Sequence, residues 1–144
     1  MHISAKGNYG LRAVLDLSAH YGQGSILSAD IASRQQIPEA YLVQLLNLLG
    51  KAGLIRSVRG PKGGHQLLRR PEDVCVGEVL AALEGPVDLL GKGELRSPDG
   101  PEIDVLRDIW LAVENAINDV LFAVTFADLC KKQQMQQTNF TFRI

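Results

Sequence analysis

The chain has 144 residues, of which 46% are hydrophobic and 22% charged, enough for one ordinary domain with a buried core. The formal net charge is −1, yet residues 1–70 hold nine Lys and Arg against three acids, whereas residues 71–144 hold six against thirteen. Two cysteines are too few for a disulfide framework, and no apolar run reaches the ~18 residues of a membrane span. A disulfide-stabilised protein and a membrane-spanning protein are therefore both disfavoured.

This charge asymmetry favours a first half that faces nucleic acid and a second half with another task. The N-terminal residues show no apolar segment of the secretory type, and we expect a reducing, cytoplasmic compartment.

Three helices are predicted in the first third of the chain. Residues 8–21 place apolar side chains at helical spacing and end before Gly22. Ser28 is suited to cap a second, short helix over residues 29–35. A break of three residues, 36–38, follows, and its proline suits the first turn of a third helix.

The third helix is predicted over residues 39–52, with Gly53 as its stop. Its inward leucines are spaced i, i+3, i+4 and i+7. They are Leu42, Leu45, Leu46 and Leu49.

A glycine-rich basic loop then separates two apolar runs, residues 54–58 and 66–68, which predicts a β-hairpin. Two helices, a tight break, a helix and a hairpin form the pattern of a winged helix-turn-helix. The expected fold class is therefore mainly α with a small β-hairpin wing, an α+β fold with a long dimerisation helix.

The C-terminal half predicts a short helix over residues 76–84, a loop over residues 91–101 and a long helix over residues 103–124. A last short helix is predicted over residues 125–132, before a polar tail that we expect to be frayed. The predicted organisation is a DNA-binding domain over residues 1–86, a linker over 87–101, the dimerisation and last helices over 102–132, and the tail over 133–144.

The third helix is the expected recognition helix, because a helix-turn-helix places its second helix in the major groove. There Gln44 is suited to adenine edges, Val43 to a thymine methyl group and Glu39 to cytosine N4. The alternative is an ordinary solvated helix face. Tyr41 is suited equally to a phosphate and to packing.

The hairpin loop favours the DNA-binding interpretation. Arg59 has the reach to enter a minor groove, and Lys62 with the neighbouring glycine amides is suited to phosphates. Lys6 and the N-terminus of the first helix offer another phosphate contact. The residues predicted to contact DNA are Lys6, Glu39, Ala40, Tyr41, Val43, Gln44, Arg59, Gly60, Pro61, Lys62, Gly63 and Gly64.

The long helix carries a heptad seam, which predicts pairing with a second copy and hence a homodimer on near-palindromic DNA. The alternative is packing within its own chain. The seam residues are Ile103, Leu106, Trp110, Val113, Ile117, Val120 and Val124.

Catalytic and metal-binding patterns are weak, and no enzyme activity is expected. Cys75 lies between two valines and fits a buried small side chain better than a nucleophile. The three histidines have no partner at metal-ligand spacing. His65 is suited to a phosphate or, more simply, to closing the hairpin.

Four segments together resemble the Rrf2 family of bacterial transcription regulators, which includes the iron–sulfur cluster regulator. They are S-A-K-G-N-Y-G-L-R-A at 4–13, Y-L-V-Q-L-L at 41–46, K-A-G-L-I-R-S-V-R-G-P-K-G-G-H at 51–65 and V-G-E-V-L-A-A-L-E-G at 76–85. The match extends over about residues 1 to 130. The resemblance implies a homodimer with crossing long helices that binds operator DNA, most often as a repressor.

Two departures from the family pattern bear on function. Many members hold an iron–sulfur cluster with three cysteines and a histidine, and the matching positions here are Lys92, Pro98, Asp104 and Arg107. The resemblance therefore implies a cluster-free member. The family also commonly has a glutamate where Val43 stands, which implies a different operator preference.

A second hypothesis, from another class, is a protein-interaction module. In it the acidic C-terminal half recruits a partner, and the hairpin loop has lost its role. Under either hypothesis a small molecule or a partner enzyme is the expected signal, and a thiol response through Cys75 or Cys130 is a weaker alternative.

Overall fold

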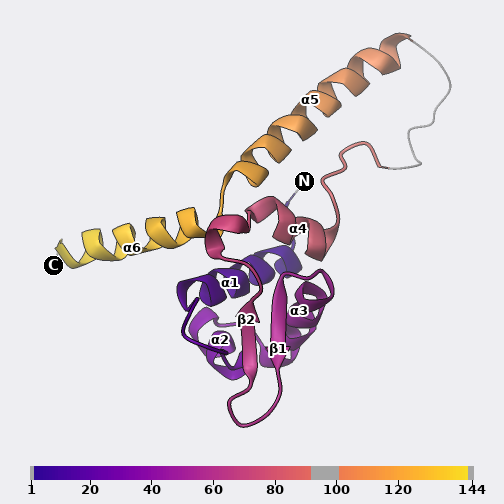
Figure 1. Ribbon diagram of the computed structural model, residues 1–144. Helices are drawn as coiled ribbons and strands as arrows, with labels where there is room; N and C mark the ends of the chain where they lie inside the picture. Colours follow the sequence, from indigo (N-terminus) through magenta and orange to yellow (C-terminus); the bar gives the residue numbers. More distant parts are fainter. Residues whose placement is uncertain (1, 92–100, 143–144) are drawn as a thin grey trace.

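The computed structural model describes residues 2–91 and 101–142, and it describes side chains over residues 2–91 and 105–139. Within these ranges six helices, one 3₁₀ turn and a two-stranded antiparallel sheet confirm the predicted fold class (Figure 1). The elements are α1 (Ala5–Ala19), α2 (Ser28–Gln35), α3 (Glu39–Lys51), β1 (Ile55–Val58), β2 (Gly64–Leu67), η1 (Pro71–Asp73), α4 (Val76–Glu84), α5 (Pro101–Ala123) and α6 (Phe126–Phe142).

The core lies where α1, α2, α3 and α4 meet the hairpin. The four leucines predicted to face inward from α3 are at most 1% exposed, so the helical spacing identified the buried face correctly. Ile31 and Ala32 of α2 and Val79, Leu80 and Leu83 of α4 are buried as predicted. Gly53 follows α3 with φ +76°, a left-handed conformation that favours glycine and ends the helix.

Helix α1 begins at Ala5, three residues before the predicted start. The Ser4 hydroxyl caps it by accepting from the Gly7 amide at 3.2 Å. Polar residues of this first turn carry no apolar periodicity, which explains the error. Gly10 lets α1 approach α4 closely, because a Cβ there would lie 2.1 Å from Leu83 Cδ1.

The predicted cap of α2 was wrong. Leu27 occupies the N-cap position and makes no side-chain cap hydrogen bond. Ser28 is the first helical residue, and its hydroxyl faces the Glu39 carboxylate across 3.5 Å instead.

The hairpin pairs Ile55 with Leu67 and Val58 with Gly64, so β2 begins two residues before the predicted strand. A third segment also joins the hairpin. Ile26, between α1 and α2, exchanges two backbone hydrogen bonds with His65, at 2.8 and 2.7 Å. This pairing extends the sheet by one residue and fixes the loop end of β2 to the segment between α1 and α2.

The junction of α5 and α6 is bound to the residues that precede α4. The Val76 amide donates to the Val124 carbonyl and the Phe126 amide donates to the Val74 carbonyl, both at 2.9 Å. Phe126 is fully buried in the core, and Cys75 is 8% exposed, which confirms it as a buried small side chain. Helix α5 therefore leaves the domain from a fixed point.

Helix α6 is much longer than the predicted short helix, because it continues through most of the expected tail to Phe142. Thr125 and Asp128 cap its start reciprocally, the Thr125 amide donating to Asp128 Oδ2 at 3.0 Å and the Asp128 amide donating to Thr125 Oγ1 at 3.1 Å.

The predicted loop over 91–101 lies outside the described residues from 92 to 100, and the predicted domain boundaries remain predictions. Among the described helices, none is long and apolar enough to cross a membrane.

Candidate nucleic-acid interface

Helix α3 presents a polar outer face opposite its buried leucines. Glu39, Ala40, Val43 and Gln44 are exposed, and Val43 keeps 39% of its surface accessible although it is apolar. The structure thus brings the proposed base-contacting residues together on one face of one helix.

Tyr41 differs from these neighbours because its ring is partly buried. It meets the Tyr9 ring edge-on, with centroids 5.8 Å apart and an interplanar angle of 77°. Packing is therefore established for this ring. A phosphate contact concerns only its hydroxyl.

The hairpin loop, which we call the wing tip (residues 59–62), projects at the end of the molecule opposite α5 (Figure 1). All four of its residues are exposed. Arg59 and Lys62 make no hydrogen bond or ion pair with the residues that the structure describes. By contrast, Arg69 pairs with Glu78, and Arg70 pairs with Asp73 at 3.2 Å. The two wing-tip cations are thus available to an external anion.

Gly63 and Gly64 have structural roles that the sequence did not reveal. The Gly63 amide donates to the Gly60 carbonyl at 2.8 Å, so it is used inside the loop rather than offered to a phosphate. Gly64 has φ +147°, and a Cβ there would lie 2.5 Å from the Ile26 carbonyl oxygen. The Gly63 amide is therefore already bonded within the loop, and the predicted DNA contacts of this segment stay predictions.

His65 closes the hairpin. Its Nδ1 lies 2.9 Å from the Ser57 hydroxyl on the paired strand. Burial lowers the pKa of His65, which favours a neutral ring at neutral pH. A neutral ring bonded across the sheet suits the structural role better than a phosphate contact.

Lys6 lies in the first turn of α1, half-buried. The Ser4 hydroxyl at this helix end contacts the carboxylate of Glu84, the last residue of α4. A carboxylate beside a helix N-terminus already complements its positive end. A phosphate contact here would therefore rely on the Lys6 ammonium rather than on the helix end.

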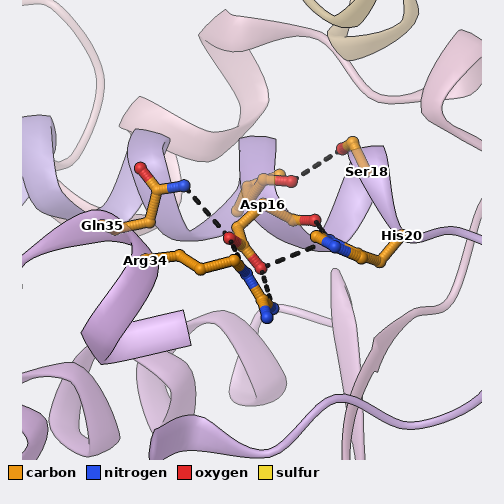
Figure 2. A network of polar contacts seen from close by, with 6 residues as sticks. Asp16, Ser18, His20, Arg34 and Gln35 are labelled. Atoms are coloured by element: carbon orange, nitrogen blue, oxygen red, sulfur yellow. Dashed lines mark hydrogen bonds and ion pairs between the residues drawn. The ribbon is translucent and has the colours of Figure 1, made fainter. Parts of the chain in front are cut away.

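Helices α1 and α2 share a polar network that sequence reasoning missed (Figure 2). Asp16 is 3% exposed and accepts from Arg34 at 2.9 and 2.8 Å and from the Gln35 side chain at 3.0 Å. His20 Nδ1 lies 3.5 Å from the same carboxylate. Burial raises the pKa of Asp16. The hydrogen bonds from Arg34 and Gln35 and the charge of Arg34 lower it by more, so the pKa lies below its ordinary value.

Helix α5 carries an apolar surface that the described part of its own chain leaves uncovered. Of the predicted seam, Leu106, Trp110 and Val120 are 55%, 47% and 64% exposed. Val113, Ile117 and Val124 are half-buried, and the side chain of Ile103 lies outside the described residues. Other apolar side chains of α5 are exposed as well, namely Val105, Ile109, Leu111 and Phe122.

The described residues contain no group of three or more His, Cys, Asp or Glu side chains arranged to hold a metal ion. Of the four apparent cluster-ligand positions, Arg107 is exposed on α5, whereas Lys92, Pro98 and the side chain of Asp104 lie outside the described residues. The whole chain has two cysteines. These donors do not fit an iron–sulfur cluster, which normally binds several thiolates.

Comparison with known proteins decides the family. Residues 3–132 match the Rrf2 family model, which is described as an iron-dependent transcriptional regulator. This chain belongs to the Rrf2 family. The family assignment agrees with the resemblance seen in the four sequence segments.

Relatives with established names are transcription regulators. The HTH-type transcriptional regulator CymR of Bacillus subtilis (strain 168) is 33% identical over 144 residues, which covers 100% of both chains. The HTH-type transcriptional regulator IscR of Vibrio campbellii is 36% identical over 138 residues, covering 94% of this chain and 80% of the relative.

Solved structures agree with these relatives. T. potens IscR superposes with a TM-score of 0.79 at 38% identity, covering 95% of this chain and 91% of the other. CymR, described as the global cysteine regulator of B. subtilis, superposes with a TM-score of 0.78 at 32% identity, covering 92% and 98%. This Rrf2 protein is therefore a DNA-binding transcription regulator with a winged helix-turn-helix fold, and its relatives are regulators rather than enzymes.

Proposed function

We propose that this Rrf2 protein acts as a homodimer that represses transcription by occupying a near-palindromic operator, without an iron–sulfur cluster. The exposed apolar surface of α5 carries the proposal. A helix of 23 residues is about 34 Å long, and burying its apolar side chains against a second copy is the simplest way to remove them from water. A dimer places two recognition helices on one face of DNA.

Base readout is assigned to the outer face of α3. In this arrangement Gln44 bonds adenine, Val43 contacts a thymine methyl group and Glu39 accepts from cytosine N4. The exposure of all three side chains supports the assignment. The valine side chain accepts no hydrogen bond. The base that faces Val43 therefore need not be one that donates a hydrogen bond.

The wing tip supplies the second contact. Arg59 enters the minor groove and Lys62 pairs with a phosphate, and both cations are free of protein partners among the described residues. Gly60 and Pro61 shape the exposed turn, and Ala40 leaves room on α3 for close approach to DNA. Repression follows from occupancy, because a bound dimer excludes other proteins from the same DNA.

Arg59→Ala tests the DNA contact. The change is expected to weaken binding by about 1–3 kcal/mol, because one groove-inserted cation is lost. A gel shift measures it, with a near-palindromic duplex that the wild-type protein selects from a random-sequence pool.

The matched control is Arg70→Ala, which removes a cation that is already paired with Asp73. It should bind the selected duplex like the wild type. A wild-type protein that enriches no duplex at moderate salt would refute the proposed function, and an unchanged Arg59→Ala affinity would refute the role of the wing tip.

A cluster-free regulator should bind its operator without iron. We expect protein purified without air to show no visible iron–sulfur absorption and to keep its operator affinity after treatment with an iron chelator, because thiolate ligands are missing. Ultraviolet–visible spectroscopy and a sulfide assay check this. Brown protein containing acid-labile sulfide would contradict it.

A further inference from the structure

Three side chains of α1 contact α2 or α3 and take no part in the proposed DNA contacts. Tyr9, Arg12 and Asp16 are spaced i, i+3 and i+7, which places them on one side of the helix. Each contacts the helix-turn-helix unit directly. We propose that Arg12 is a positioning residue that sets the orientation of α3 for operator recognition, an inference that rests on the proposed function.

The first part of the argument is the turn itself. Gln36 follows α2 with φ +54°, a left-handed conformation that is costly for a residue other than glycine. Such a conformation persists only when surrounding contacts hold it. The Gln36 amide donates to the Ala32 carbonyl, and the Ile37 amide donates to the same oxygen at 3.0 Å.

Arg12 supplies a contact from outside the turn. Its Nη1 donates to the carbonyl oxygen of Gln35 at 2.9 Å, directly before the left-handed residue. One helical turn further along α1, Asp16 binds the side chains of Arg34 and Gln35 (Figure 2). The end of α2 is therefore held at its backbone by one α1 residue and at its side chains by another.

Arg12 also reaches the recognition helix through an aromatic pair. Its guanidinium carbon lies 4.8 Å from the centroid of the Tyr9 ring, within the range of a cation–π contact. Tyr9 in turn meets Tyr41, in the first turn of α3. Arg12 thus contacts the last residue of α2 directly and the start of α3 through the Tyr9 ring.

Two observations separate this role from simple stabilisation. Arg12 makes no ion pair with any described residue, and its Nε is buried without a hydrogen-bond partner among them. An unsatisfied buried N–H destabilises the folded state, which offsets part of the stabilisation from the other contacts of Arg12. Removing Arg12 should therefore change overall stability little while it frees the turn.

Arg12→Met is the test, with the selected operator duplex and a scrambled duplex of the same composition as probes. We expect affinity for the selected duplex to fall about tenfold, the loss of one charge-assisted hydrogen bond, and affinity for the scrambled duplex to stay within about twofold. The slope of log affinity against log salt concentration should not change, since Arg12 contacts no phosphate.

Other outcomes would overturn the proposal. A salt slope reduced by about one would make Arg12 a direct phosphate contact. A lower melting temperature with both affinities unchanged would make it merely structural. Lys132→Met, which removes an exposed cation of α6, is the charge-matched control and should bind both duplexes like the wild type.

Tyr9→Leu provides a second variant in case Arg12→Met does not fold. It removes the ring between Arg12 and Tyr41 and keeps the positive charge, so it should lower the ratio of specific to non-specific affinity in the same way. An unchanged ratio in the folded Tyr9→Leu protein would overturn the positioning role. If the wild-type protein enriches no sequence from the pool, the proposed function fails. That result differs from a variant whose affinity ratio equals that of the wild type, which refutes only the positioning role.

Discussion

Trp110→Glu is expected to convert the protein to a monomer and to weaken operator binding by about 100-fold or more, because two linked half-site contacts become separate events. Trp110 lies in the middle of the α5 seam and is 47% exposed in the isolated chain. A glutamate there costs the monomer little. In a paired interface it would bury an uncompensated charge.

Sedimentation velocity measures the oligomeric state, and a gel shift with the selected duplex measures affinity. Asn115→Glu is the matched control, since it adds the same charge to an exposed position of α5 opposite the seam. That variant should remain a dimer and bind normally. A wild-type protein that sediments as a monomer while binding its operator tightly would contradict the proposed dimer.

The fold of the first half could be predicted because its elements depend on local pattern. The i, i+3, i+4, i+7 leucines of α3 identify both the helix and its buried face. Glycines at positive φ end α3 and α4 where expected, at Gly53 and Gly85. The outward residues of α3 then follow from the helical period, which is why the candidate base contacts could be named from the sequence.

Contacts between distant segments could not be predicted in this way. Gly64 is constrained by Ile26, which lies 38 residues away, so the local sequence does not reveal that packing requires a glycine there. The start of β2 was misplaced because Gly64 and His65 were counted with the glycine-rich loop, whereas they pair with Val58 and Ser57. Nothing in the local sequence of the hairpin indicates that a segment between two helices pairs with it.

Helix α6 shows a different limit. Beyond Lys132 its sequence is rich in glutamine and lacks apolar periodicity, which is the main sequence signal for a helix. The Thr125–Asp128 capping pair marks the start but says nothing of the length. The charged pair between α1 and α2 was missed likewise, since Asp16 and Arg34 look like ordinary surface residues until the two helices are placed side by side.

That buried pair gives the prediction with the largest expected effect on folding. Asp16→Asn should destabilise the protein by about 2–3 kcal/mol, less than for a fully buried pair because Arg34 is 40% exposed. The variant keeps the shape of the side chain but removes the charge that Arg34 and Gln35 bind. Chemical denaturation at neutral pH measures the difference. Asp73→Asn, an identical change in an exposed pair with Arg70, is the control and should have a much smaller effect.

The effect of Asp16→Asn should also depend on pH in one direction. Because the pKa of Asp16 in the folded protein lies below the ordinary value of 3.8, the carboxylate contributes fully above that value and loses its contribution as pH falls through the folded-state pKa. The stability difference between wild type and variant should therefore be constant from pH 7 down to about pH 5 and shrink in more acidic solution. A difference that grows on acidification would mean that Asp16 is protonated in the native state, and the network in Figure 2 would then not be the charged one described.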